Sequence, residues 1–126
     1  YDKNEVLRVL KPNGTFIVNQ NGSDNLHEFL SMYMPFKMRG VWDMNSCAMT
    51  LADAGFEVVE TKEDRGYIRF HNLRQIQTYF RKVAPEVAEN VAQYKSFYMH
   101  ALDEIKQNTY FQLTTYRFLV VAKKNF

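Results

Sequence analysis

The stretch EVLRVLKPNGTFIV, residues 5–18, joins a short amphipathic segment to a strand through one tight turn. Apolar residues at helical spacing, followed by Pro12, predict a helix over residues 3–11. The Pro-Asn-Gly turn then leads into a β-branched and aromatic run over residues 15–18. A helix, a turn and a buried strand form half of an αβ unit, so this stretch favours a layered α/β fold.

The chain starts only a few residues before this unit. Asp2 and Glu5 have the spacing of a capping box, so the first helix begins almost at Tyr1, which is not a Met. We therefore expect a cut end, with further chain upstream in a longer parent protein. An initiating Met directly before Tyr1 would instead indicate a self-contained domain.

Polar and apolar patterns alternate through the next part of the chain. The polar residues 19–25 predict a loop at the carboxyl end of the first strand, and the apolar stripe over residues 26–33 predicts a short helix. A further helix is expected to begin at a cap, Asn45 or Ser46, and to end at Gly55 in the C′ position.

The remaining sequence predicts two more strands separated by helices. A strand is expected over residues 56–61, and residues 67–70 are either its continuation or a separate short strand. Asn72 opens a helix with a second capping box, and apolar residues spaced by threes and fours predict the longest helix over residues 86–107. The closing strand, over residues 110–122, becomes apolar on both faces, so we expect it to be covered on both faces and central in the sheet.

Composition excludes several classes of protein. With 126 residues, of which 46% are hydrophobic and 24% charged, the chain can build one core. Its 16 basic residues are scattered among 14 acidic ones, so no nucleic-acid footprint is expected. The single Cys47 excludes a disulfide framework, and neither a membrane-spanning run nor a leader is visible, so we expect a soluble, cytoplasmic protein.

Three motifs carry a resemblance to a known family. Residues 5–16, EVLRVLKPNGTF, resemble the recurrent segment E..RVLKPGG.f of class I, Rossmann-like S-adenosylmethionine-dependent methyltransferases, with Asn13 in place of the first Gly. Residues 51–60, LADAGFEVVE, resemble the family's helix-to-strand junction L..aGF.vve. Residues 116–123 resemble its closing strand,..r.l.vakK. The motifs follow in the family's order and span nearly the whole chain.

The resemblance implies a fold and a position within it. The segments 15–18, 56–61 and 111–122 would be the fifth, sixth and seventh strands, with the seventh antiparallel between the other two. Residues 72–107 would be a helical insertion before the last strand, serving as a cap or substrate-side element. The resemblance thus implies the C-terminal portion of a methyltransferase domain, covering residues 1–126.

The family's cofactor-binding features have no counterpart in this chain. The glycine-rich turn and the acidic residues that hold S-adenosylmethionine lie upstream in the family, and the five glycines here are dispersed. The resemblance therefore implies that the cofactor is bound mainly by a missing N-terminal half. We assign no cofactor-binding residue here and expect the fragment to be inactive alone.

Polar residues at the end of the first strand are the first candidates for a substrate site. Asn19, Gln20 and Asn21 follow the strand at its carboxyl end, where open α/β sheets hold ligands, so they are expected to contact substrate or methyl donor. The alternative is a plain polar loop. His27 can act as a base because its ordinary pKa is near neutrality, although an isolated surface histidine is the alternative.

An aromatic and Met-rich segment supplies the next candidate. Trp42 can line an adaptable apolar substrate pocket, and core packing is the alternative. The residues grouped with it are Tyr33, Phe36, Met32, Met34, Met38 and Met44. Arg69 can face the substrate side or be an ordinary residue of a half-exposed strand. Cys47 is interpreted as a small buried hydrophobe, and no spacing suggests a metal site.

The sequence therefore favours an enzyme acting on a small molecule. We expect transfer of a methyl group from S-adenosylmethionine to a small-molecule or other nucleophilic acceptor. The alternatives are a non-enzymatic α+β binding module and another nucleotide-binding Rossmann enzyme. If upstream strands are missing, the edge of the first strand is open, so homo-oligomers through that edge are expected.

Overall fold

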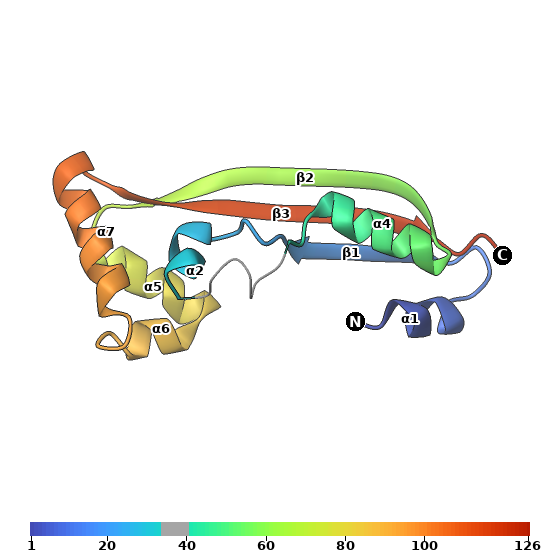
Figure 1. Cartoon of the computed structure of the whole chain (residues 1–126), viewed down its shortest axis with the longest axis horizontal. Coiled ribbons are helices and arrows are strands. Elements are labelled where there is room, and N and C mark those ends of the chain that lie inside the picture. The colour runs from blue at the N-terminus through green and yellow to red at the C-terminus, as the bar shows by residue number, and fades with distance from the viewer. Residues whose placement is uncertain (34–40) are drawn as a thin grey trace.

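The computed structural model describes residues 1–33 and 41–126. Its strands are β1 (Thr15–Asn21), β2 (Glu57–Phe70) and β3 (Phe111–Lys123), shown in Figure 1. Its helices are α1 (Lys3–Val9), α2 (His27–Tyr33), α4 (Met44–Ala54), α5 (Leu73–Val83), α6 (Pro85–Glu89) and α7 (Lys95–Asn108). Within the described ranges, none of these helices has the length and apolar character needed to cross a membrane.

The three strands form one antiparallel sheet in the order β1-β3-β2. β3 pairs with β1 from Thr15 opposite Lys123 to Asn21 opposite Arg117, and with β2 along its whole length. The closing strand is therefore central and antiparallel to both neighbours, as predicted. β1 lies at one edge of this sheet.

Burial along β3 changes face in the middle of the strand. Phe111 and Leu113 are buried at odd positions, whereas Tyr116 and Phe118 are buried at even positions. Because successive side chains of a strand point to opposite faces, the two halves of β3 bury opposite faces of the sheet. Thr114 and the residue after it mark the change.

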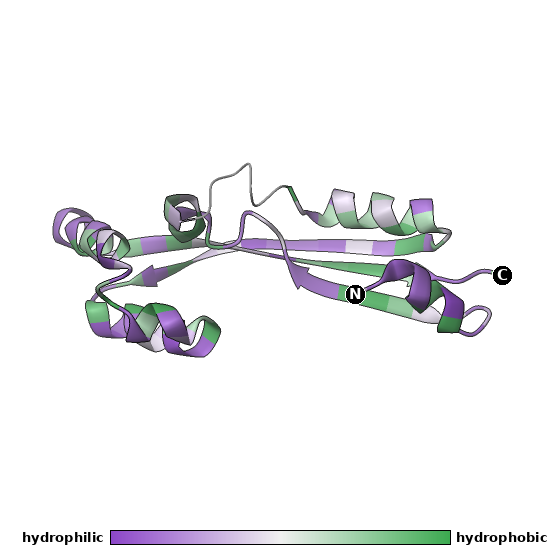
Figure 2. Cartoon of the chain, turned by 60° about the horizontal axis from the view of Figure 1, so that its bottom comes forward, coloured by the Kyte–Doolittle hydropathy of each residue, from purple (hydrophilic) through white to green (hydrophobic). Residues whose placement is uncertain are grey.

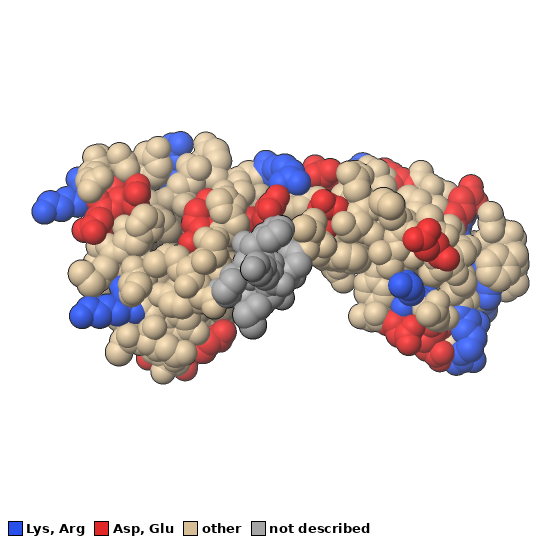
Figure 3. All heavy atoms as spheres, viewed as in Figure 1, with Lys and Arg blue, Asp and Glu red and all other residues tan. Residues whose placement is uncertain are grey.

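Two hydrophobic cores result, one at each end of the sheet. α2, α5, α6 and α7 gather around the end that contains Phe111, whereas α1 and α4 pack near Phe118 (Figure 1). Hydrophobic residues are concentrated along the half of the sheet near α1 and α4 in Figure 2. In Figure 3 the two ends form separate lobes with a narrow waist between them.

The expectation that the closing strand is covered on both faces is wrong for the described residues. Leu119 and Val121 lie on the face of β3 opposite α1 and α4, and both are only partly buried. Ile17, which pairs with Val121, is 58% exposed, and Val59 on β2 is 47% exposed. This half of the sheet has one packed face and one open apolar face.

The local signals for helix ends are mostly confirmed. Asp2 accepts hydrogen bonds from the backbone N–H groups of Asn4 and Glu5, and Asn72 accepts one from that of Gln75. Gly55 ends α4 with a φ of 111°, a left-handed conformation that favours glycine.

The cap of α4 and the extent of two strands differ from expectation. Asp43, rather than Asn45 or Ser46, caps α4 by accepting the backbone N–H of Ser46 at 2.8 Å. β2 is continuous to Phe70, which settles the alternative for residues 67–70. β1 continues to Asn21, so the predicted loop over residues 19–25 is wrong at its start, because β3 supplies backbone partners to these polar residues.

The single long helix predicted over residues 86–107 is also wrong. α6 ends at Glu89, and α7 begins at Lys95. Asn90 donates hydrogen bonds from its backbone and side-chain nitrogens to the Glu86 carbonyl, which ends α6 locally. The change of direction leaves Val91 39% exposed, whereas a straight stripe would bury it.

Candidate functional site

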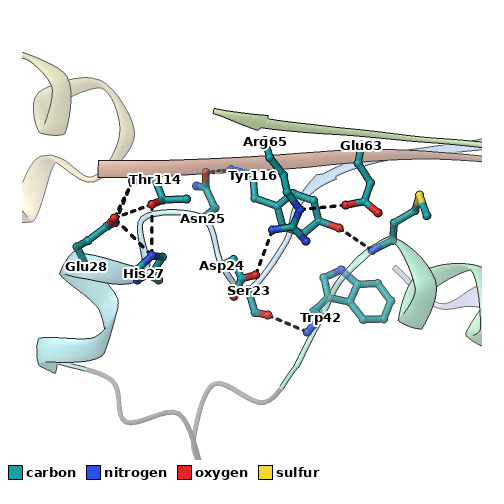
Figure 4. A network of polar contacts seen from close by, with 11 residues as sticks. Ser23, Asp24, Asn25, His27, Glu28, Trp42, Glu63, Arg65, Thr114 and Tyr116 are labelled. Atoms are coloured by element: carbon teal, nitrogen blue, oxygen red, sulfur yellow. Dashed lines mark hydrogen bonds and ion pairs between the residues drawn. The ribbon is translucent and has the colours of Figure 1, made fainter. Parts of the chain in front are cut away.

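The waist of the molecule is where β1 ends and β3 continues without it. Beyond Asn21, the chain still follows β3: the Gly22 N–H donates to the Tyr116 carbonyl at 3.2 Å, and the Leu26 N–H to the Thr114 carbonyl at 2.7 Å. Side chains satisfy the N–H groups that β1 no longer reaches. This polar network is drawn in Figure 4.

Two side chains accept these exposed N–H groups of β3. Asn25 Oδ1 accepts from the Tyr116 backbone N–H at 2.9 Å. Both carboxylate oxygens of Glu28 accept from the Thr114 backbone N–H, at 2.9 and 3.1 Å, and Glu28 Oε2 also accepts the Thr114 hydroxyl at 2.6 Å. Glu28 is therefore fixed in place by the strand.

This fixed carboxylate positions His27. The His27 Nε2 atom lies 3.4 Å from Glu28 Oε2 and 3.3 Å from Thr114 Oγ1 (Figure 4). A carboxylate beside Nε2 favours the tautomer that carries its proton there, which leaves the Nδ1 lone pair to accept a proton. The His27 side chain is 47% exposed, so a ligand can reach it.

A second group of interacting side chains, centred on Arg65 and Tyr116, stabilises the other side of the waist. The Arg65 guanidinium lies 3.8 Å above the Tyr116 ring and forms ion pairs with Asp24 and Glu63, both at 3.2 Å. The Tyr116 hydroxyl accepts the backbone N–H of Met44 at 3.0 Å. Burial raises the pKa of Tyr116, so its hydroxyl stays neutral. We interpret these mutually paired groups as structural.

Trp42 and Gln20 line a cleft next to the group of Arg65 and Tyr116. The Trp42 Nε1–H donates to Gln20 Oε1 at 2.9 Å, which fixes the plane of the indole ring. The cleft has a volume of about 510 Å³, within the range of small-molecule sites. Its other lining residues are Tyr1, Asp2, Lys3, Asn4 and Thr50.

The structure brings together only some of the predicted site residues. Gln20 and Trp42 are in contact, and His27 lies further along β3. Asn19 and Asn21 alternate with Gln20 and so point to the opposite face, where the Arg117 guanidinium donates to Asn19 Oδ1 at 3.4 Å.

Arg69 lies away from the waist, near the far end of β2. Its register partner on β3 is Gln112, and it lines a different cleft from Trp42.

The residues grouped with Trp42 serve mainly in packing. Tyr33 belongs to the helical lobe, where its hydroxyl accepts the Phe97 N–H at 3.0 Å, and Met44 packs in the core near α4. Met32 is 41% exposed. Met34, Phe36 and Met38 lie outside the described residues.

Cys47 is fully buried, and burial raises the pKa of its thiol, so the interpretation as a small hydrophobe is confirmed. Within residues 1–33 and 41–126, no group of three or more His, Cys, Asp or Glu side chains is placed to hold a metal ion.

Sequence reasoning missed the residues that organise the waist: Asn25, Glu28, Arg65 and Thr114. The sequence signal is the pair Thr114-Thr115, which interrupts the alternation of apolar and polar residues in β3 where burial changes face. The contacts of Thr114 with His27 and Glu28 span more than 80 residues, so no local pattern predicts them.

Comparison with known proteins gives a likeness in fold. No protein-family model and no curated protein matches the sequence. A crystal structure of a candidate methyltransferase from Bacillus halodurans matches 98% of this chain with a TM-score of 0.63 and 15% sequence identity. This chain spans 57% of the length of that structure. At this identity the likeness shows a methyltransferase-like α/β fold.

Proposed function

We propose that this chain is the C-terminal portion of an S-adenosylmethionine-dependent methyltransferase. The observation that carries the proposal is the antiparallel insertion of β3 between β1 and β2, in a chain whose motifs resemble that family. Under this proposal β1, β2 and β3 are the fifth, sixth and seventh strands. α5, α6 and α7 form the helical insertion before the last strand.

The open surfaces of the sheet support an absent upstream half. β1 is an edge strand, and the face of the sheet that contains Ile17, Val59, Leu119 and Val121 is not covered by described residues. The matched structure is longer than this chain, which spans 57% of it. Upstream strands and helices would pair with this edge and bury this apolar face.

The cleft beside Trp42 is the proposed site for the methyl acceptor. It lies near the carboxyl end of β1, the position at which open α/β sheets hold ligands. The Trp42 indole offers a flat apolar wall, and its hydrogen bond to Gln20 holds that wall in one orientation. When bound, S-adenosylmethionine would supply the methyl group.

His27 is the proposed base for an acceptor that must lose a proton. Its Nδ1 atom would take that proton while Glu28 holds the Nε2–H. His27 contacts Thr114, whereas Gln20 pairs with Phe118, four positions along β3. This separation is roughly 13 Å at about 3.3 Å per residue, so an acceptor that touches both must be elongated.

Calorimetry with S-adenosylmethionine tests the proposal. The full-length parent protein is expected to bind the cofactor, and this 126-residue chain alone is not. Trp42→Ala and His27→Asn in the parent are expected to leave cofactor affinity unchanged and to reduce methyl transfer. His100→Asn is the matched control, because this histidine lies on α7 and is 51% exposed. A parent that neither binds the cofactor nor contains an upstream glycine-rich turn would refute the proposal.

A non-enzymatic binding module is the second candidate. Its support is that the chain assembles two buried cores, and that the side chains of Asp24, Asn25 and Arg65 at the waist already have protein partners. Failure of the parent to bind S-adenosylmethionine, with a stable fold for this chain alone, would favour this candidate.

A further inference from the structure

A second cleft lies beside α5, at the far end of β2 from the Trp42 cleft. Its volume is about 540 Å³. The lining residues that matter here are Arg69, Phe70, Arg74, Thr78, Tyr79 and Lys82, and the cleft shares no lining residue with the Trp42 cleft. We refer to it as the α5 cleft. Methyl transfer as proposed above makes no use of it.

The lining of the α5 cleft carries an uncompensated positive charge. Arg69, Arg74 and Lys82 are basic residues, and no Asp or Glu is among the lining residues. Arg74, Thr78 and Lys82 recur every four residues, so they follow one side of α5. No ion pair within the described part of the chain involves either Arg74 or Lys82. The field of these cations is therefore available to an anionic ligand.

Arg69, which lines this cleft, is fixed in place by residues outside it. Its guanidinium carbon lies 4.3 Å from the centre of the Tyr110 ring and 4.7 Å from that of Tyr67, and its Nε–H donates to Gln112 Oε1 at 3.0 Å. These contacts limit the rotamers of a long side chain. Binding of an anion to Arg69 would therefore cost little further conformational entropy of this side chain.

The α5 cleft also has an aromatic, neutral surface, from Tyr79 on α5 and Phe70 at the end of β2. The Tyr79 ring packs edge-on against Phe70 with centroids 5.5 Å apart. Burial raises the pKa of Tyr79, so its phenol remains a neutral donor at physiological pH. Cations and an aromatic ring in the same cleft suit a molecule with a charged end and a planar or apolar body.

We propose that the α5 cleft binds a small organic phosphate, a phosphate monoester attached to a planar or apolar group. Arg69, Arg74 and Lys82 contact the phosphate, because guanidinium and ammonium groups donate several hydrogen bonds to a dianion. Tyr79 packs against the body of the ligand. A phosphate is favoured over a single carboxylate because three cations line one cleft.

Titration of the full-length protein with phenyl phosphate, followed by calorimetry or NMR, tests the site. We expect saturable binding that is tighter than that of inorganic phosphate. The double variant Arg74→Glu and Lys82→Glu is expected to bind at least about tenfold more weakly, because like charges repel across a binding site. Arg81→Glu is the matched control, since it changes the same kind of charge on the same helix outside the cleft lining.

Several results would overturn the inference. One is the absence of saturable binding up to about 10 mM phenyl phosphate, which would place any affinity below that of an ordinary weak ligand. Another is an equal loss in the Arg81→Glu control, which would indicate general electrostatic attraction. Equal affinity for phenyl phosphate and inorganic phosphate would show that Tyr79 does not contact the body of the ligand. Binding of a short oligonucleotide but not of phenyl phosphate would show that the ligand is a polyanion rather than a small organic phosphate. Circular dichroism of each variant checks that weaker binding does not arise from unfolding.

Discussion

The Tyr116 hydroxyl accepts a 3.0 Å hydrogen bond from the backbone N–H of Met44, 72 residues away in sequence. This contact joins the middle of β3 to the first turn of α4. Tyr116 is fully buried, and the bond satisfies one of the N–H groups that every helix leaves open at its start. The residue therefore links the sheet to the helix that forms one wall of the waist.

Tyr116→Phe is expected to lower the free energy of unfolding by about 1 kcal/mol, the usual net worth of one hydrogen bond. The fold should persist because the ring remains in place. Urea denaturation of the variant measures the loss. Tyr67→Phe is the control, since Tyr67 is 58% exposed, and it should change stability by less than about 0.5 kcal/mol. Equal losses in the two variants would contradict the role given to Tyr116.

Gly22→Ala is expected to destabilise the waist. A Cβ atom at this position would lie 2.2 Å from Cε2 of the Tyr116 ring and 3.0 Å from the Trp42 carbonyl oxygen. Because the ring is buried, the backbone must shift, at a cost of about 1–3 kcal/mol. Gly66→Ala is the control, since its nearest neighbour is the Thr115 hydroxyl at 3.2 Å. Thermal denaturation should separate the two variants, and a Gly22 variant as stable as the control would refute the clash.

Short-range signals predicted much of this fold. Capping at Asp2, Asn72 and Gly55 depends on residues a few positions apart, and each is found where expected. The apolar run of β3 predicted a central strand, and β3 is central, although one face of this run is open in the part of the chain that the structure describes. The parts that failed depend on contacts distant in sequence. Asn21 is polar but extends β1 because β3 offers it hydrogen-bond partners.

The candidate site was less predictable than the fold for the same reason. Gln20 and Trp42 are both visible in the sequence, but their contact depends on how the chain returns to the sheet. The position of His27 depends on Glu28 and Thr114, which meet because β1 ends early. A change of burial face within one strand also escapes a search for regular alternation.

Asp43 is expected to make the stability of α4 depend on pH. The backbone N–H of Ser46, together with its side chain, holds the pKa of the Asp43 carboxyl below its ordinary value. Because the pKa of Asp43 is lower in the folded than in the unfolded state, its ionised carboxylate stabilises the protein at pH values above the unfolded-state pKa, near 4. This contribution is lost as the pH falls through the folded-state pKa. Asp43→Ala should cost about 1 kcal/mol at pH 7 and less at pH 3. Urea denaturation at both pH values measures the difference, and a cost independent of pH would show that the charge of Asp43 does not contribute.

Cys47 is expected to resist alkylation in the folded protein. Its side chain is fully buried, and burial raises the pKa of the thiol, so both access and the thiolate fraction are low. Labelling with iodoacetamide at pH 7.5, about a unit below the ordinary thiol pKa, should be slow in buffer and fast in denaturing urea. Rapid, complete labelling under native conditions would show that α4 opens readily from the sheet.

The edge of β1 and its open face are expected to make this chain self-associate. Ile17 is 58% exposed on an edge strand, beside partly buried Val121 on the same face. Unpaired backbone groups at such an edge are a template for another strand, and a charge placed there opposes pairing. Ile17→Lys should therefore shift the chain towards monomer in a concentration series by light scattering. Val83→Lys on α5 is the control, because Val83 is 52% exposed in the other lobe and should leave the association unchanged. A strict monomer at high concentration, or equal shifts in both variants, would remove β1 as the interface.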